Sequence, residues 1–207
     1  MTETEGVIKF DLEWHAESAW QGPEIDVLER WRSDMLAHEV LGQIPARYDG
    51  FGFGNLSARV TPGFLISGTQ TGASATLGAE GYAVVLGWEL GRNRVTARGP
   101  VKPSSESLTH AALYEAEPTV AWIFHGHSPV LWRHGTALDL PLTDPAVPYG
   151  TPAMAAEVKR LSREAMDGAG ILIMGGHQDG FIAFGGDAER VGGAMLDYLD
   201  RASREET

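Results

Sequence analysis

Two histidines, His125 and His127, follow a short apolar run and are the first residues of the sequence that could do chemistry. The run, 120–124, comes after Pro118, and its composition predicts a buried strand. Residues two apart on an extended chain point the same way and lie about 7 Å apart along it. Two imidazoles placed in this way can hold one metal ion, and the small Gly126 between them crowds neither. The plainer interpretation is a strand end whose polar residues leave the core.

A catalytic metal site needs a third protein ligand and an open position. His177 ends a predicted strand inside a glycine-rich turn and is the natural third ligand. Glu106, in the first turn of a predicted helix, is the candidate acid/base, although it could instead only stabilise that helix end. His110 lies four residues further along the same helix, and we expect it to pack or to support a ligand. The remaining histidines are interpreted as structural or surface residues: His15, His38 and His134.

Three short clusters of small residues could bind an anion. They are 54–57 (GNLS), 67–69 (SGT) and 104–105 (SS), and each offers hydroxyls and accessible backbone N–H groups. The third also lies at a predicted helix N-terminus, where the dipole favours negative charge. Taken singly, each cluster is more typical of a turn or a helix cap. Only their convergence on one site would favour a binding function.

Composition and charge exclude several classes of protein. Of 207 residues, 43% are hydrophobic and 21% are charged, with a formal net charge of −12, which makes nucleic acid and anionic membranes poor partners. No apolar run is long enough to span a membrane, and the acidic start of the sequence does not resemble a signal peptide. The absence of cysteine leaves only His, Asp, Glu, water or substrate as metal ligands. The expected location is the cytoplasm.

Hydrophobic spacing predicts helices and strands that do not alternate strictly. We therefore expect an α/β fold with a mixed or mostly antiparallel sheet and helices packed on it. The expected strands are 7–14, part of 48–60, 64–66, 82–88, 94–97, 119–125, 170–174 and 180–184. The expected helices are 24–43, 104–117 with Ser104 or Ser105 as N-cap, 151–167 with Thr151 as N-cap and Pro152 at N1, and 187–203 capped by Asp187. We expect 128–150 to be irregular, and the whole of 1–207 to form a single domain in which 1–23 is an atypical N-terminal extension.

The order of these motifs resembles that of the class II aldolase/adducin family, and in particular of its L-fuculose-phosphate aldolase-like members. The matching words are GNLSARV at 54–60, SGT at 67–69, KPSSES at 102–107, H-x-H at 125–127, PYGT at 148–151 and the strand-Gly-Gly-His of 171–177. KPSSE followed about twenty residues later by H-x-H is a fairly specific combination. The resemblance covers roughly residues 24–200.

This resemblance implies a three-layer α/β/α sandwich around a mostly antiparallel mixed sheet, in homotetramers whose active sites lie at subunit contacts. It implies that His125, His127 and His177 bind a divalent metal, most often Zn²⁺, with Mn, Co or Fe as alternatives. It gives Glu106 the role of acid/base. The groups that would bind a phosphate or another anion of the small-molecule substrate are Asn55, Ser67, Gly68, Ser104 and Ser105. The implied activity is that of a lyase: retro-aldol cleavage of a small hydroxylated carbonyl compound, such as a sugar phosphate, through a metal-stabilised enediolate.

Two departures from the family pattern point to a branch with its own substrate. Aldolases of the family carry a proton-donating tyrosine in a longer segment after H-x-H, whereas 128–147 here contains no tyrosine, and Tyr149 belongs to the PY word. The family's usual His-Gly is also interrupted, as His177 is followed by Gln178-Asp179 before the glycine. Asp179 could orient His177 through a hydrogen bond, or could simply form a turn.

Two alternatives to retro-aldol cleavage stay open. An epimerase or a dehydratase could use the same site and the same enediolate. A non-enzymatic, adducin-like interaction module could keep the fold alone. The presence of Glu106 together with three histidines argues against the module, because protein interaction does not need a matched acid and ligand set.

Overall fold

A computed structural model describes residues 6–163 and 169–206 of the chain. An eight-stranded sheet runs through the molecule in the order β1-β7-β6-β5-β4-β8-β10-β9. Every neighbouring pair is antiparallel except β1 and β7, which are parallel. The strands of this sheet are β1 Asp11–Ala16, β4 Asn55–Arg59, β5 Phe64–Ser67, β6 Tyr82–Glu89, β7 Arg94–Gly99, β8 Trp122–His127, β9 Ala169–Ile173 and β10 Gly180–Gly185. A separate pair is formed by β2 Gly42–Gln43 and β3 Gly52–Phe53.

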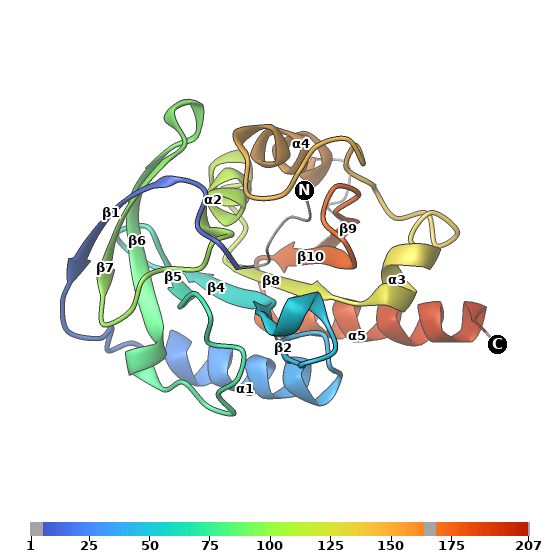
Figure 1. The fold of residues 1–207 in the computed structure, drawn as a ribbon, viewed down its shortest axis with the longest axis horizontal. Helices are drawn as coiled ribbons and strands as arrows, with labels where there is room; N and C mark the ends of the chain where they lie inside the picture. The colour runs from blue at the N-terminus through green and yellow to red at the C-terminus, as the bar shows by residue number, and fades with distance from the viewer. Residues whose placement is uncertain (1–5, 164–168, 207) are drawn as a thin grey trace.

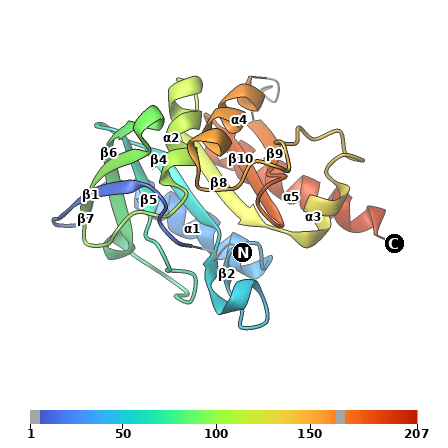
Figure 2. The same ribbon diagram turned by 45° about the horizontal axis from the view of Figure 1, so that its top comes forward.

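Helices cover both faces of the sheet, so the expected three-layer α/β/α sandwich is confirmed (Figure 1). One face carries α2 (Ser107–Ala116) and α4 (Pro152–Ser162), which pack against each other. The opposite face carries α1 (Glu24–Ala37) and α5 (Ala188–Glu205), with the short α3 (Pro129–His134) against α5. Figure 2 shows the same arrangement from above, with α2 and α4 forward of the sheet. Among the described residues, no helix is long and apolar enough to cross a membrane.

The alternation of side chains along the strands divides the interior into two cores. In β8, Ile123 belongs to the core beneath α2 and α4, whereas its neighbour Phe124 belongs to the core against α1 and α5. Both side chains are fully buried. This alternation is that of a strand covered on both faces, and it decides where the two histidines that follow must point.

Two helix starts agree with their predicted caps. The hydroxyl of Thr151 accepts a hydrogen bond from the backbone N–H of Met154, with Pro152 at the first helical position of α4. The carboxylate of Asp187 accepts one from the N–H of Arg190 and so caps α5. Each of these side chains satisfies one of the backbone donors that a helix start leaves unpaired.

Several predicted boundaries are wrong. The helix that begins at Glu24 ends at Ala37 instead of Gln43, because Val40 and Leu41 both donate to the carbonyl of Met35 in a tight turn and Gly42 enters β2. The first strand covers 11–16 instead of 7–14. The segment 128–150, expected to be irregular, contains α3, whose N-cap is Ser128. Part of the predicted end of the helix at 151–167 lies outside the described residues.

Candidate active site

His125 and His127 continue the face of Ile123 on β8, so both imidazoles point to the α2 side of the sheet. The Nδ1 of His125 lies 2.9 Å from the carbonyl oxygen of Phe181 on the neighbouring strand β10. A backbone carbonyl can only accept, so His125 carries its proton on Nδ1 and leaves Nε2 as the lone-pair nitrogen. The backbone N–H of His127 donates to the carbonyl of Val40 at 2.8 Å. The first bond orients the His125 ring, and the second holds the backbone at His127.

His177 lies in the turn between β9 and β10, and the structure brings it to the two strand histidines. One ligand nitrogen from each of the three rings lies within 4.8 Å of the others, and all three side chains are buried. The Nε2 atoms of His125 and His127 are 3.2 Å apart. Two nitrogens on a tetrahedral zinc ion, each about 2.0–2.1 Å from the metal, would be about 3.3 Å apart. The donor set and its spacing therefore fit a divalent metal.

Burial keeps His127 neutral. The pKa of His127 is lowered well below its ordinary value by burial, and further by the nearby His177, His125 and Arg47. A neutral imidazole has a lone pair to give, whereas a protonated one has none. His127 is therefore in the protonation state that binds a cation.

Glu106 is the N-cap residue of α2, so the prediction of Ser104 or Ser105 as N-cap is wrong. Its backbone N–H donates to the hydroxyl of Ser104 at 3.2 Å, and one of its carboxylate oxygens accepts from the hydroxyl of Thr109 at 2.9 Å. The side chain is 2% exposed. A buried carboxylate held at a helix N-terminus fits a group that exchanges protons with a bound molecule, as well as one that stabilises the helix.

The three small-residue clusters converge on one small cleft. The backbone carbonyl of Ser67 accepts from the N–H of Ser104, and Gly68 forms an isolated bridge with Pro103, which joins the end of β5 to the approach to α2. The cleft is lined by glycine, serine, threonine, asparagine and glutamine without a charged side chain, and its lining includes Asn55, Gly68, Thr69, Ser104 and Ser105. The predicted Ser67 lies just behind it, buried, with its hydroxyl accepting from the N–H of Leu56. Asn55 pairs directly with His125 across β4 and β8, so the cleft adjoins the histidines.

The far wall of the cleft is a loop at 68–78 that α1 holds in place. The guanidinium of Arg32, 1% exposed, donates to the carbonyls of Thr71, Ser74 and Ala75. The carboxylate of Glu29 accepts from the N–H groups of Leu77 and Gly78 and from the Tyr82 hydroxyl. Because these bonds tie the backbone of the 68–78 loop to α1, the loop is held in the position where it lines the cleft. Neither residue was predicted to have a role, since their hydrogen-bond partners lie 39 to 53 positions away in the sequence.

The predicted hydrogen bond between Asp179 and His177 is not present among the described residues. The carboxylate of Asp179 instead accepts from the hydroxyl of Tyr48 at 2.8 Å, and its carbonyl accepts from the N–H of Ser128. Tyr48 also receives a hydrogen bond from Arg47 and packs its ring edge-on against His127, with centroids 4.8 Å apart. Both Tyr48 and Asp179 have positive φ, at 49° and 64°, a backbone conformation that is rare outside glycine. Asp179 therefore ties the His177 turn to the 44–54 loop.

Two further groups surround the cluster. The ring of Tyr149 stacks on His177, with centroids 4.1 Å apart and planes 12° apart.

A second group is a buried hydrogen-bond network next to the strand histidines. The hydroxyl of Ser57 bonds both the Nδ1 of His110 and the hydroxyl of Tyr114, and all three residues are buried. His110 is thus a packed residue of α2, as predicted, and burial lowers its pKa. His15 and His38 are exposed and His134 is half-buried, which agrees with a structural or surface role.

A family model described as Class II Aldolase and Adducin N-terminal domain matches residues 45–202. This chain belongs to that family. The resemblance inferred from the motif words is confirmed, and the chain is an aldolase-like member of the class II aldolase family. Part of it is similar to a methylthioribulose-1-phosphate dehydratase of Gluconacetobacter diazotrophicus, with 33% identity over 87 residues. The match covers 40% of this chain and only 40% of the dehydratase.

Solved structures with the same fold show how far the likeness extends. An L-fuculose-1-phosphate aldolase from Thermus thermophilus has a TM-score of 0.64 at 21% identity, covering 86% of this chain and 90% of the aldolase. YgbL, a putative aldolase/epimerase/decarboxylase from Klebsiella pneumoniae, has a TM-score of 0.60 at 19% identity, with 87% and 86% covered. At these identities the comparison establishes a shared class II aldolase fold and leaves the reaction to be argued from the site.

Proposed function

We propose that this class II aldolase family member is a divalent-metal-dependent lyase that cleaves small hydroxylated carbonyl compounds carrying an anionic group, such as a phosphate. The observation that carries this proposal is the group of three buried imidazoles, with ligand nitrogens within 4.8 Å of one another, beside an uncharged cleft of backbone and hydroxyl groups. The three imidazoles would hold a cation, and the cleft suits an anion.

His125, His127 and His177 would hold the metal, and zinc suits a ligand set of imidazoles without thiolates, with Mn, Co and Fe as alternatives. When bound, such an ion supplies Lewis-acid polarisation of substrate oxygens. Asn55, Gly68, Ser104 and Ser105 would bind the anionic group in the cleft and so fix the distance between that group and the reacting carbons. Burial of Glu106 excludes water from its carboxylate, which can then exchange a proton with the substrate.

In retro-aldol cleavage the β-hydroxyl loses its proton and becomes a carbonyl, while the bond between the α- and β-carbons breaks. The electron pair of that bond stays with the α-carbon fragment, and a proton returned to this carbon completes its carbonyl product. We assign the return of the proton to the α-carbon to Glu106. The other proton transfer is the loss of the β-hydroxyl proton. No tyrosine lies in 128–147 to take this proton, so another group must do so.

Dehydration is the second candidate, favoured by the 33% identity to the dehydratase segment. In this reaction a proton leaves the carbon next to the carbonyl and the hydroxyl of the following carbon leaves as water. The two reactions give different products from one substrate: cleavage gives two carbonyl compounds, and dehydration gives one compound and water.

The test is to incubate the zinc-loaded protein with a panel of ketose 1-phosphates and to identify products by NMR. Two carbonyl products would support the aldolase, whereas a single dehydrated product would support the dehydratase. An epimerised sugar phosphate would establish the third option. A metal-loaded protein that converts none of the panel would favour the adducin-like interaction module. We also propose a homotetramer, as is expected for this family, which light scattering of the purified protein would test.

A further inference from the structure

The segment Gly6–Phe10, which precedes β1, lies outside the part of the chain that the family model matches. In Figures 1 and 2 the blue ribbon leaves the edge strand β1 and runs back to the middle of the sheet, where β4 and β8 lie. Phe10 anchors the segment, because its side chain is buried in the α2–α4 core, and Ile8 packs against the same core. The segment is therefore held across the molecule at a defined place.

One end of the segment forms part of the anion cleft. Gly6 lies in the cleft lining with Gly68, Ser104 and Ser105, and its carbonyl accepts a hydrogen bond from the hydroxyl of Thr69 at 3.1 Å. Its φ is +70°, and a Cβ added there would lie 1.9 Å from the Nε2 atom of Gln70. The positive φ favours glycine here, and a Cβ would also push aside the flexible Gln70 amide.

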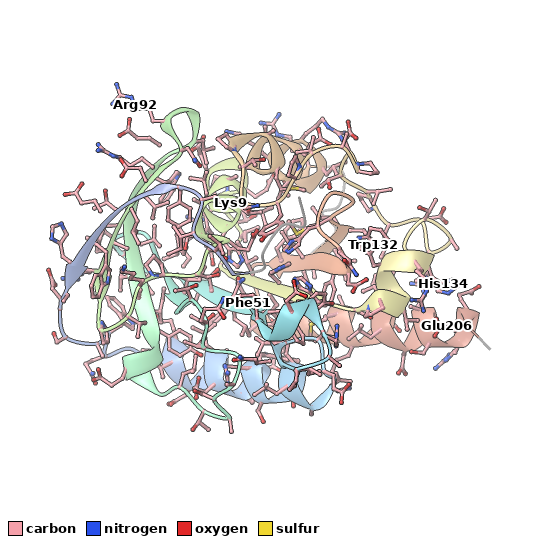
Figure 3. The ribbon with its side chains drawn as sticks, in the orientation of Figure 1. Lys9, Phe51, Arg92, Trp132, His134 and Glu206 are labelled. Carbon is pink, nitrogen blue, oxygen red and sulfur yellow. The ribbon has the colours of Figure 1, made fainter. Side chains whose placement is uncertain are left out.

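The other end contacts the metal-ligand cluster through one aromatic ring. The ammonium of Lys9 donates to the carbonyl oxygen of Tyr149 at 3.0 Å and lies 3.6 Å from the centroid of the Tyr149 ring. That same ring stacks on His177. The carbonyl of Lys9 in turn accepts from the side chain of Asn93 at 2.9 Å. In Figure 3 Lys9 lies over the central part of the molecule, whereas Arg92 and Glu206 lie at its rim.

Lys9 and Tyr149 together hold the ring plane of His177, the third proposed ligand, in one orientation. A histidine gives its lone pair in the plane of its ring, so its affinity for a metal depends on how that ring is oriented. Stacking of Tyr149 fixes the plane of His177, and a cation over the face of an aromatic ring holds that ring in place. Groups that orient metal ligands in this way typically change metal affinity or activity about 10–100-fold when they are removed.

We infer that Gly6–Phe10 is a strap that forms part of the active site: Lys9 is a positioning residue that acts through Tyr149 on His177, and Gly6 forms a wall of the anion cleft. The inference rests on the proposed function, because it assumes that the histidines hold a metal and that the cleft holds an anion.

Two measurements on the zinc-loaded protein test the strap, and neither needs the substrate. The first is the rate at which zinc passes to a chromogenic chelator, and the second is the dissociation constant for inorganic phosphate by calorimetry. Lys9→Met is expected to speed zinc release about tenfold, and Lys9→Arg, which restores a cation, is expected to bring the rate back towards the wild-type value. Gly6→Ala is expected to weaken phosphate binding severalfold while zinc release stays unchanged. Val7→Ala is the matched control within the strap, since Val7 is 46% exposed.

Wild-type zinc release in Lys9→Met, or no recovery in Lys9→Arg, would overturn the positioning role. Wild-type phosphate binding in Gly6→Ala would overturn the cleft wall. If Lys9→Met does not fold, Lys9→Gln takes its place against the same Lys9→Arg comparison. Failure of the proposed function looks different, because the wild-type protein itself would then take up no zinc or bind no phosphate.

Discussion

Gly126, between the two strand histidines, has no room for an added methyl group. A Cβ at this position would lie 2.6 Å from Cζ and 2.9 Å from Cε1 of Phe181, and 3.0 Å from the carbonyl oxygen of Val40. Phe181 is fully buried, so its ring has no free space to enter. Gly126→Ala must therefore displace one of these neighbours or the strand itself.

The expected cost follows from these contacts. Overpacking of a buried site typically destabilises by about 1–3 kcal/mol, and removal of a strand glycine returns about 0.5–1 kcal/mol. A net loss of about 1–2 kcal/mol corresponds to a fall in Tm of roughly 2–8 °C for a domain of this size. Zinc affinity should fall as well, because the carbonyl of Phe181 accepts from His125 and that of Val40 accepts from His127.

The assay is differential scanning fluorimetry of the metal-free protein, followed by a zinc titration against a competing chelator. Gly193→Ala is the matched control: no atom lies within 4 Å of its added Cβ, and Gly193 is exposed on α5. Alanine is the better helix former by about 0.8–1 kcal/mol, so this control should raise the Tm. A Gly126→Ala protein with wild-type Tm and zinc affinity would refute the argument from close packing.

Three further predictions address the groups around the cluster. Glu106→Gln should keep its zinc, measured by elemental analysis, and lose turnover, since the amide cannot accept the proton; unchanged turnover would remove Glu106 from the mechanism. Ser57→Ala leaves the buried His110 and Tyr114 without their shared hydrogen bonds and should cost about 1–3 kcal/mol in urea unfolding, whereas Ser33→Ala at an exposed position should cost almost nothing. The lowered pKa of buried His110 means that, below the ordinary histidine pKa of about 6.5, the unfolded chain binds a proton that the folded chain does not. The Tm of chelator-treated protein should therefore fall from pH 7 to pH 5, and a constant Tm over that range would contradict this assignment.

Much of the site follows from short-range rules. Side-chain alternation along 120–127 places both histidines on one face, and it depends only on residues two apart. The caps at Thr151 and Asp187 are likewise local, because each bonds an N–H three residues on. The motif order was enough to identify the family and to bring His177 to the cluster.

The contacts around the site that were missed join residues distant in the sequence. Tyr48 bonds Asp179 across 131 positions, and Lys9 bonds Tyr149 across 140. Patterns of spacing over a short stretch of sequence cannot reveal such pairs, so the only roles considered for Asp179 were a bond to His177 and a turn. The short helix at Pro129–His134 is different, since its signal was present: Ser128 caps it and proline occupies its first position. The many prolines that follow it suggested an irregular segment and hid the helix.

The central claim is that three histidines hold one catalytic metal ion, and elemental analysis of the purified protein tests it most directly. We predict about one zinc or other divalent ion per chain in the wild-type protein. The ion should be lost in His177→Ala, while the circular dichroism spectrum of the variant stays that of a folded protein. Exposed His15→Ala should keep the ion. A wild-type protein that takes up no metal after reconstitution, or a His177→Ala protein that keeps its full content, would contradict the account.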